Sequence, residues 1–411
     1  MTVWKFGCCL FFLALLAGCL PGPAAAGCIG SFSEYAYAVN PQLAAGDVAD
    51  GQPFGDTWQP VAALPAVPSS GSLQFSLAAY RQRDGQAEIW LGVAPAAEVY
   101  DDRDGPAYQF WIFDVNGQTW RQVPAAIAGS YAYAGDLLVT SDGRLWAATR
   151  WDEYAADRDY PALCRFNDDT GQFEFVVAVQ DIPTLWRGSD QASGLVTSQY
   201  PAWAVMALDP VDNFWIFAPN DGLYQYHPDQ QAAIRRLDLP GWVAAAMSPA
   251  PDGSLHIQLT DPQTLPINLD REALYQYTPE TNSIQLISPP AGIWPPGRLY
   301  TDRSGNLWLG PVGYRRPDGR WVKLHPQAWR YFWQMQVEGD DRWGTPRLIL
   351  ESSNGYVWFQ SALGQAWLDP QTHRGCWFTS EATGVLQSAD QTFWTISAGH
   401  LVKFKLDPTH P

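Results

Sequence analysis

The sequence predicts an all-β fold, a seven-bladed β-propeller of four-stranded antiparallel blades. A short phrase recurs along the chain, in which an Asp- or Gly-containing turn precedes an apolar residue and Trp, as in TDRSGNLWLG from Thr301 to Gly310. A second aromatic or apolar marker follows each copy in constant order. The chain is also rich in Gly, Pro and aromatic residues and only 16% charged, and no long segment has helical periodicity. Repeats of several short strands are typical of propellers.

One repeat unit shows four expected strands. Gly297–Thr301 comes first, and an Asp-containing turn leads into Asn306–Leu309. Gly313–Arg315 starts the third strand, and Pro317-Asp318-Gly319 forms a tight turn, because Pro fixes one dihedral angle and Gly accepts positive φ. Arg320–Leu324 alternates in hydrophobicity, as a half-buried strand does.

The phrase occurs seven times, which predicts seven blades in a single domain over residues 56–408. The anchor residues that end the seven copies are Trp90, Trp146, Trp215, His256, Trp308, Trp358 and Trp394.

The last unit has only three expected strands. Before the first full unit, Thr57 to Pro65 reads TWQPVAALP, which is similar to the outermost strands elsewhere. We therefore expect Trp58–Leu64 to be the outer strand of the last blade, so that the ring closes and leaves no open edge there.

These phrases resemble the two-component regulator propeller repeat, whose pattern is D-x-x-G-N-L-W-x-G-T-x-x-G-L. The resemblance covers roughly Leu73 to Pro408. It implies the propeller fold and a sensor or binding role, which we expect here for a stand-alone propeller. No kinase or receiver segment follows the repeats in this sequence.

The N-terminus has the pattern of an export signal, with Lys5 before the short apolar run Leu10–Leu16. Leu16-Ala17-Gly18-Cys19 resembles a bacterial lipobox, which predicts a lipoprotein signal peptide over residues 1–18 and lipidation of Cys19. Cleavage after Ala24-Ala25-Ala26 is the alternative. We expect an exported protein, lipid-anchored in the bacterial cell envelope, with an Ala-, Gly- and Pro-rich tether and extension over residues 19–55.

The net charge limits the classes of binding partner, and the cysteines suggest possible disulfide pairings. The net charge of −17 argues against nucleic acid and against a bare anionic membrane, so the membrane is expected only through the anchor. Export permits disulfides. Cys28 then has two candidate partners, Cys164 and Cys376, with Cys376 slightly favoured, and free buried cysteines remain the alternative. We expect a monomer.

The connections point to one face of the ring. With strands a to d numbered outward from the axis, the a–b and c–d turns are short, whereas the long insertions lie in b–c or d–a connections. Function tends to lie on such loops. These loops pair aromatic rings with arginines, which suits stacking on sugars, aromatic ligands or peptide side chains. The candidate ligand-binding residues are Trp151, Tyr154, Trp186, Arg187, Trp329, Arg330, Tyr331 and Trp333.

Catalytic and metal-binding patterns are weak. No histidine has the spacing of a metal site, His256 occupies a Trp position and is expected to be packed in the core, and His400 lies beside the loop face. Acidic loop clusters lack the order of a calcium-binding loop. We expect no metal, no cofactor and no catalytic residue.

Three functions are compatible with the sequence. We favour a non-catalytic binding or sensing propeller whose ligand is a carbohydrate, a peptide or a protein. A propeller lyase or glycoside hydrolase with a central site is the first alternative, and a scaffold for assembly of envelope proteins is the second.

Overall fold

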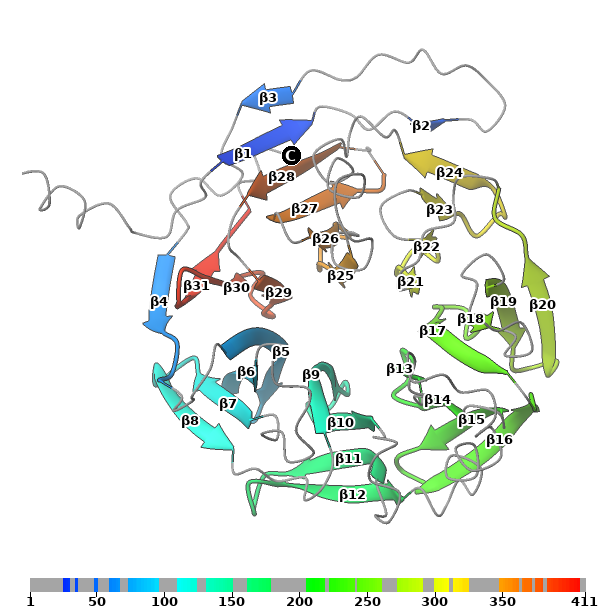
Figure 1. Cartoon of the computed structure of the whole chain (residues 1–411), viewed down its shortest axis with the longest axis horizontal. Helices are drawn as coiled ribbons and strands as arrows, with labels where there is room; N and C mark the ends of the chain where they lie inside the picture. The colour runs from blue at the N-terminus through cyan, green and yellow to red at the C-terminus, as the bar shows by residue number, and fades with distance from the viewer. Residues whose placement is uncertain are drawn as a thin grey trace, which may run out of the picture.

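Seven antiparallel sheets follow one another around a central axis in the computed structural model (Figure 1). In each sheet the first strand lies nearest the axis and the chain steps outward strand by strand, so the prediction of a seven-bladed propeller is confirmed. No helix in the described part of the chain has the length and apolar character needed to cross a bilayer. The structure describes residues 25–29, 34–35, 48–50, 59–66, 73–95, 109–123, 131–150, 161–178, 205–218, 222–240, 242–260, 272–290, 299–309, 313–324, 347–361, 364–371, 374–379 and 383–406.

The first four blades contain four strands each, ordered from the axis outward. Blade 1 is β5 (Leu73–Arg83), β6 (Gln86–Pro95), β7 (Gln109–Asp114) and β8 (Thr119–Val123); blade 2 is β9 (Tyr131–Val139), β10 (Leu145–Arg150), β11 (Pro161–Asn167) and β12 (Gln172–Ala178); blade 3 is β13 (Val205–Leu208), β14 (Phe214–Ala218), β15 (Gly222–His227) and β16 (Ala232–Asp238); blade 4 is β17 (Val243–Pro249), β18 (Leu255–Thr260), β19 (Glu272–Thr278) and β20 (Ser283–Ile287).

The other three blades each include a strand from the N-terminal segment. Blade 5 is β21 (Leu299–Thr301), β22 (Leu307–Leu309), β23 (Gly313–Arg315) and β24 (Trp321–Leu324), followed at the rim by β2 (Glu34–Tyr35); blade 6 is β25 (Arg347–Glu351), β26 (Val357–Ser361), β27 (Gly364–Asp369) and β28 (Arg374–Thr379), followed by β1 (Ala25–Ile29) and β3 (Val48–Asp50); blade 7 is β29 (Thr383–Gln387), β30 (Phe393–Ser397), β31 (His400–Phe404) and β4 (Gln59–Ala63).

β4 closes the ring as the sequence predicts. It pairs antiparallel with β31, with Ala62 opposite Leu401 and Gln59 opposite Lys403. Its residues match the expected strand Trp58–Leu64 to within one position at each end. The fourth strand of blade 7 therefore comes from the opposite end of the chain.

The strands β1, β2 and β3 lie within residues 19–55, where the sequence predicts a tether and no strand. Each is short, and β1 reads AAGCI, which has neither alternating polarity nor a strong β propensity. They pair at the rim, β1 with β28 and β2 with β24 (Figure 1). The outer edges of blades 5 and 6 are therefore covered by added strands.

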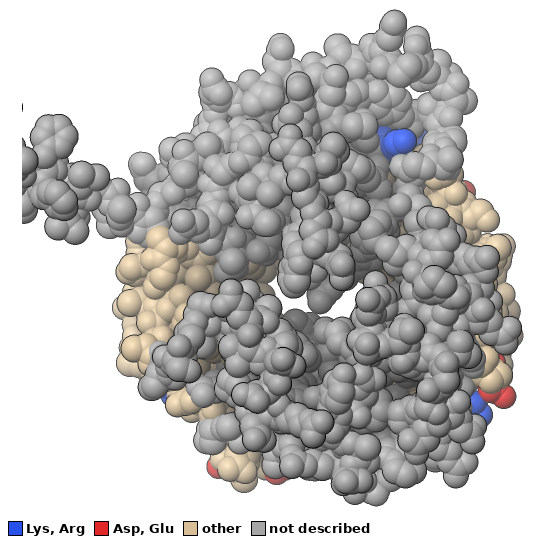
Figure 2. Space-filling view, in the orientation of Figure 1, with Lys and Arg blue, Asp and Glu red and all other residues tan. Residues whose placement is uncertain are grey.

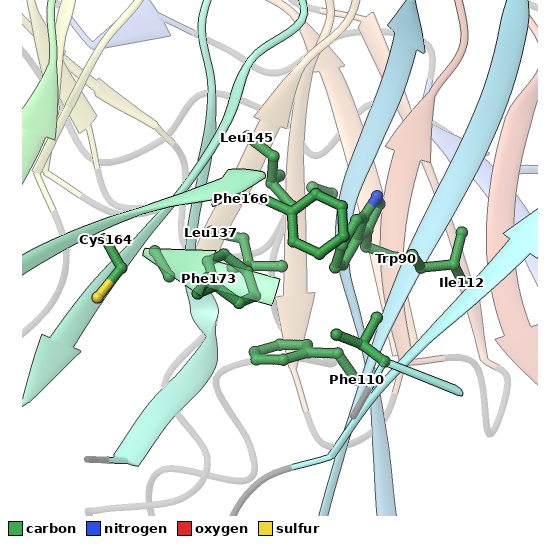
Figure 3. Close-up of a cluster of buried hydrophobic side chains, with 11 residues drawn as sticks. Trp90, Phe110, Ile112, Leu137, Leu145, Cys164, Phe166 and Phe173 are labelled. Atoms are coloured by element: carbon green, nitrogen blue, oxygen red, sulfur yellow. The ribbon is translucent and has the colours of Figure 1, made fainter. Parts of the chain in front are cut away.

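The core of the molecule lies between neighbouring blades. Between blades 1 and 2, Trp90 from β6 meets the ring of Phe166 from β11 edge-on, with ring centroids 4.8 Å apart (Figure 3). Phe110 and Phe173 close the same cluster. All seven anchor residues are at most 4% exposed, so the repeated position is the main packing position of each blade.

The turn before each anchor explains the rest of the repeated phrase. In blade 5 the Asp302 carboxylate accepts hydrogen bonds from the backbone amides of Ser304 and Asn306, at 3.0 and 2.8 Å. It also accepts one from the indole Nε1 of Trp308 at 2.8 Å. Gly305 has a φ of 80°, which favours glycine. The phrase D-x-x-G-N-L-W is therefore a turn that fixes its own tryptophan.

Candidate functional site

The two faces of the ring differ in their connections, as the sequence predicts. We call the face formed by the a–b and c–d connections the turn face; its a–b connections lie at 84–85, 140–144, 209–213, 250–254, 302–306, 352–356 and 388–392. The opposite face, formed by the b–c and d–a connections, we call the loop face; its longest connections are 96–108, 151–160, 179–204, 261–271, 288–298 and 325–346.

The eight predicted ligand-binding residues belong to three of these connections, and all eight lie outside the described residues. The strands on either side of the connections are described. Residues 151–160, with Trp151 and Tyr154, join β10 to β11 within blade 2. Residues 179–204, with Trp186 and Arg187, join the rim strand β12 to the innermost strand β13 of the next blade. Residues 325–346, with Trp329, Arg330, Tyr331 and Trp333, join β24 to β25 in the same way.

The two d–a connections start and end in well-separated parts of the ring. β12 and β13 belong to blades 2 and 3, whereas β24 and β25 belong to blades 5 and 6 (Figure 1). Each connection has one end at an outermost strand and the other at an innermost strand. The axis-side ends of the two connections, at β13 and β25, therefore lie in separate parts of the ring (Figure 1), and the described residues seen in the space-filling view lie mainly at its sides (Figure 2).

One tryptophan of the loop face is described, and it contributes to packing. Trp242 lies between β16 and β17, where it is half-buried against the core of blades 3 and 4. Its ring meets that of Tyr275 edge-on, with centroids 6.1 Å apart. Trp242 therefore fastens its own connection to the blades, which is the alternative role for any loop tryptophan.

On the turn face, polar groups join neighbouring blades. The Ser141 amide of blade 2 donates to the Asp212 carboxylate of blade 3 at 2.9 Å. The Arg303 amide of blade 5 donates to the Glu351 carboxylate of blade 6 at 2.8 Å. Ser353 of blade 6 donates its amide to the side chain of Gln387 of blade 7. These hydrogen bonds between turns fix neighbouring blades relative to one another.

A buried charge cluster joins blades 1 and 2. Arg81 is only 5% exposed, and its guanidinium donates to Glu88 at 3.0 Å and to Asp168 of blade 2 at 2.6 Å. The guanidinium carbon lies 5.8 Å from the centre of the Trp90 ring and 5.6 Å from that of Phe166, within the range of cation–π attraction. Arg81 therefore holds the two blades together.

Blades 5 and 6 share a second buried polar cluster. The hydroxyl of Tyr300 donates to Glu351 at 3.1 Å, and the Glu351 side chain is 4% exposed. Burial, followed by the nearby Glu351 charge, raises the pKa of Tyr300, and burial raises the pKa of Glu351. Perturbed carboxyls often mark active sites. Here the carboxyl is enclosed between two blades, so a substrate has no access to it.

The two histidines of interest have different surroundings. His256 is 4% exposed and its Nδ1 lies 3.0 Å from the hydroxyl of Thr301, which confirms the expected core position. Burial lowers its pKa to about 4, so it is neutral at pH 7. His400 lies at the loop face, where its Nδ1 donates to the Ala398 carbonyl at 2.9 Å in the b–c turn of blade 7. This bond orients the ring.

Within the described part of the chain, no group of three His, Cys, Asp or Glu side chains could hold a metal ion. The acidic loop segments at 101–104, 152–159 and 338–341 lie outside the described residues.

No protein-family model matches the sequence, and no curated protein matches it. Solved propeller structures are similar at low identity. A streptogramin B lyase is 14% identical with a TM-score of 0.45, and the match covers 82% of this chain and 98% of the lyase. YCF48 bound to a D1 peptide is 12% identical with a TM-score of 0.48, covering 88% of this chain and 98% of that one. The extracellular domain of the hybrid two component system BT4673 from B. thetaiotaomicron is 14% identical with a TM-score of 0.33, covering 80% and 45%. None of these TM-scores reaches 0.5, so no activity is carried over from them.

Proposed function

We propose that this chain is a non-catalytic binding or sensing propeller, and that its ligand, a carbohydrate, a peptide or a protein, binds on the loop face. The division of the connections between the two faces is the observation that supports the proposal. The turn face consists of short turns bonded to neighbouring blades, whereas every long connection belongs to the loop face. A rigid ring that presents variable loops on one side is a common arrangement for a binding surface.

The residues proposed to carry binding are the eight aromatic and arginine residues of the loop face. An aromatic ring stacks on a sugar face or a peptide side chain with little loss of conformational entropy, because it has only two rotatable bonds. Arginines beside the rings add donors for hydroxyl, carbonyl or carboxylate groups. The d–a connections that carry Trp186 and Trp333 supply such groups from two sides of the ring.

Catalysis has less support among the described residues. Two of the buried ionisable groups with perturbed pKa, Glu351 and Tyr300, are bonded to each other between two blades. Arg81 and Glu88 are likewise bonded to each other. A lyase or glycoside hydrolase site would instead need accessible acids and bases around the axis.

The proposal is tested by screening the purified chain on a glycan array and against immobilised peptides from bacterial cell-envelope proteins. Once a ligand is found, replacing both Trp186 and Trp333 with Ala is expected to weaken binding about thirtyfold, since each stacked ring contributes roughly 1 kcal/mol. The change is measured by titration calorimetry. Stability should change little, because both residues lie in the sequence between the described strands of neighbouring blades, β12 and β13 or β24 and β25.

Two exposed apolar residues provide matched controls. Val211 lies on the turn face and is 75% exposed, and Leu286 lies in the rim strand β20 and is 55% exposed. Val211→Ala and Leu286→Ala should leave binding unchanged. Weakening by these variants instead of the tryptophan pair would favour a scaffold that uses the rim or the turn face, and release of a cleaved product from a bound glycan would favour the enzyme.

We further propose that the chain is exported and anchored through a lipid on Cys19. The apolar run before Cys19 and the sequence Leu16-Ala17-Gly18-Cys19 support this. Cys19→Ser is expected to move the protein from the membrane fraction to the soluble fraction, which detergent phase partitioning measures. Unchanged partitioning would contradict the lipid anchor and favour simple secretion.

A further inference from the structure

We propose that Cys28 and Cys376 form a disulfide that fastens the N-terminal strand β1 to the rim of blade 6. The two cysteines occupy directly opposite positions in the antiparallel pair β1–β28. The proposal rests on the export half of the proposed function, because disulfides persist in extracytoplasmic compartments.

The register supplies the distance that a disulfide needs. Directly opposite residues of an antiparallel pair have Cα atoms about 4.5 or 5.5 Å apart, depending on whether they exchange hydrogen bonds. Disulfides bridge Cα atoms separated by about 4.4 to 6.8 Å. A register shifted by one residue would put Gly375 or Trp377 opposite Cys28. The observed register is the one that aligns the two cysteines.

The competing partner, Cys164, lies elsewhere and is enclosed. It belongs to β11 of blade 2, opposite Ala147 and Phe175, and is fully buried in the cluster between blades 1 and 2 (Figure 3). Burial raises the pKa of its thiol to about 12, so almost none of it is the reactive thiolate at neutral pH. Cys164 therefore remains a free thiol. Of the two candidate disulfide partners of Cys28 that the sequence leaves open, Cys376 is the one that the structure favours.

The bond changes what holds the N-terminal segment. β1 contains five residues and pairs with β28 at the rim, outside the four strands of the blade. β4, which follows β1 and β3 in the chain, pairs with blade 7. A covalent link at Cys28 fixes the segment to blade 6 as well, so that the segment remains joined to the ring even when β4 separates from β31.

The oxidation requires a disulfide oxidant, such as oxidised glutathione or a disulfide-carrying protein. A thiolate of one cysteine attacks the oxidant, breaks its sulfur–sulfur bond and forms a mixed disulfide. The second cysteine then attacks the mixed disulfide and forms the protein bond. Two protons leave the cysteines, and the two electrons reduce the oxidant to two thiols.

Peptide mapping tests the bond directly on the whole exported chain. The chain is incubated with oxidised glutathione, unfolded in urea, alkylated without reduction and digested with trypsin. Cleavage after Arg374 and Lys403 isolates Cys376 in the peptide 375–403, and Cys28 falls in the peptide that ends at Arg81. We expect these two peptides to be linked and to separate on reduction. Cys164 should be alkylated in the peptide 159–165.

Cys28→Ser and Cys376→Ser should each abolish the link between the two peptides, and Cys164→Ser, the matched control, should keep it.

Reduction should also lower the melting temperature of the natural chain by a few degrees and leave that of Cys376→Ser unchanged. Alkylation of both Cys28 and Cys376 in the oxidised chain would overturn the proposal, as would a link from either to Cys164. A melting temperature insensitive to reduction would show that the bond does not fasten the segment. Retention of Cys19→Ser in the membrane fraction would contradict the lipid anchor alone, so the two proposals fail separately.

Discussion

Removal of residues 20–64 is expected to lower the stability of the ring by roughly 5 kcal/mol, whereas removal of residues 20–50 has a much smaller effect. The longer deletion takes away β4, and each of the backbone hydrogen bonds that β4 makes with β31 contributes about 1 kcal/mol. It also removes the Leu64 amide that donates to Gly399 at 2.9 Å and the Ala63 carbonyl that accepts from the Trp120 indole at 2.9 Å. Loss of apolar burial adds to this cost.

The apolar part comes from the boundary between blades 7 and 1. Val61 and Ala62 pack against a cluster that includes Trp394 and Leu401 of blade 7 and Phe113 of blade 1. Without β4 the outer edge of β31 is open and available to other chains. We therefore expect a melting temperature lower by about 5–10 °C and an increase in soluble aggregates.

The shorter deletion is the matched control. It removes β1, β2 and β3, which lie at the rim of blades 5 and 6, and keeps β4. Both deletions remove Cys28, so the proposed disulfide is absent from both and cancels in the comparison. Differential scanning calorimetry and size-exclusion chromatography measure the two effects. Equal melting temperatures would contradict the closing role of β4.

The repeated phrase is what makes the fold predictable. Each copy places a buried anchor in the second strand of a blade, next to the turn that precedes it. Asp302 with Trp308 and Asp209 with Trp215 share one arrangement, since both carboxylates accept from the indole nitrogen of a residue six positions later. Because the contacts are local, a single sequence is enough to recognise them.

Contacts between blades could not be predicted in the same way. Arg81 and Asp168 are 87 positions apart and belong to different blades. Neither residue is part of the repeated phrase, so nothing in the sequence links them. The position of β1 could not be predicted for a related reason. Its five residues carry no strand pattern, and they pair with β28, a strand from the far end of the chain.

The loop face is the part for which the sequence is least informative. Strands of a blade recur because they fill the same position in the ring, whereas the connections between them vary in length. Aromatic and arginine content is then the remaining signal. An aromatic residue in a loop can either bind a ligand or pack its loop against the blades, and Trp242 does the second, because its ring packs against Tyr275.

Asp302→Ala is expected to destabilise the protein by about 3–5 kcal/mol, because a buried network of hydrogen bonds to one charged group is lost. Asp302 is 1% exposed and its side chain accepts four hydrogen bonds, two from backbone amides and one each from Asn306 Nδ2 and Trp308 Nε1. Its removal leaves the indole donor of a fully buried tryptophan without a partner. That donor then bears the full cost of its desolvation.

Asp302→Asn separates the two functions of the carboxylate, which are to accept from the amides of the turn and to accept from the Trp308 indole. One oxygen can still accept from the amides of Ser304 and Asn306, but the new amide nitrogen is a donor and faces the Trp308 indole, which is also a donor. We expect a stability between those of the natural protein and of Asp302→Ala. Chemical denaturation measures the free energy of unfolding, and the near-ultraviolet circular dichroism of the tryptophans reports on the Trp308 environment.

Two aspartates serve as controls for Asp302. Asp318 lies in the exposed c–d turn of the same blade and accepts from the Arg320 amide at 2.8 Å, so Asp318→Ala should cost about 1 kcal/mol or less. Asp209 accepts from the equivalent four donors but is half-buried, and its contact with the Trp215 indole is longer, at 3.3 Å. Asp209→Ala should therefore fall between the two. If Asp302→Ala proves no more harmful than Asp318→Ala, the first residue of the phrase is needed for the turn alone and does not fix the buried tryptophan.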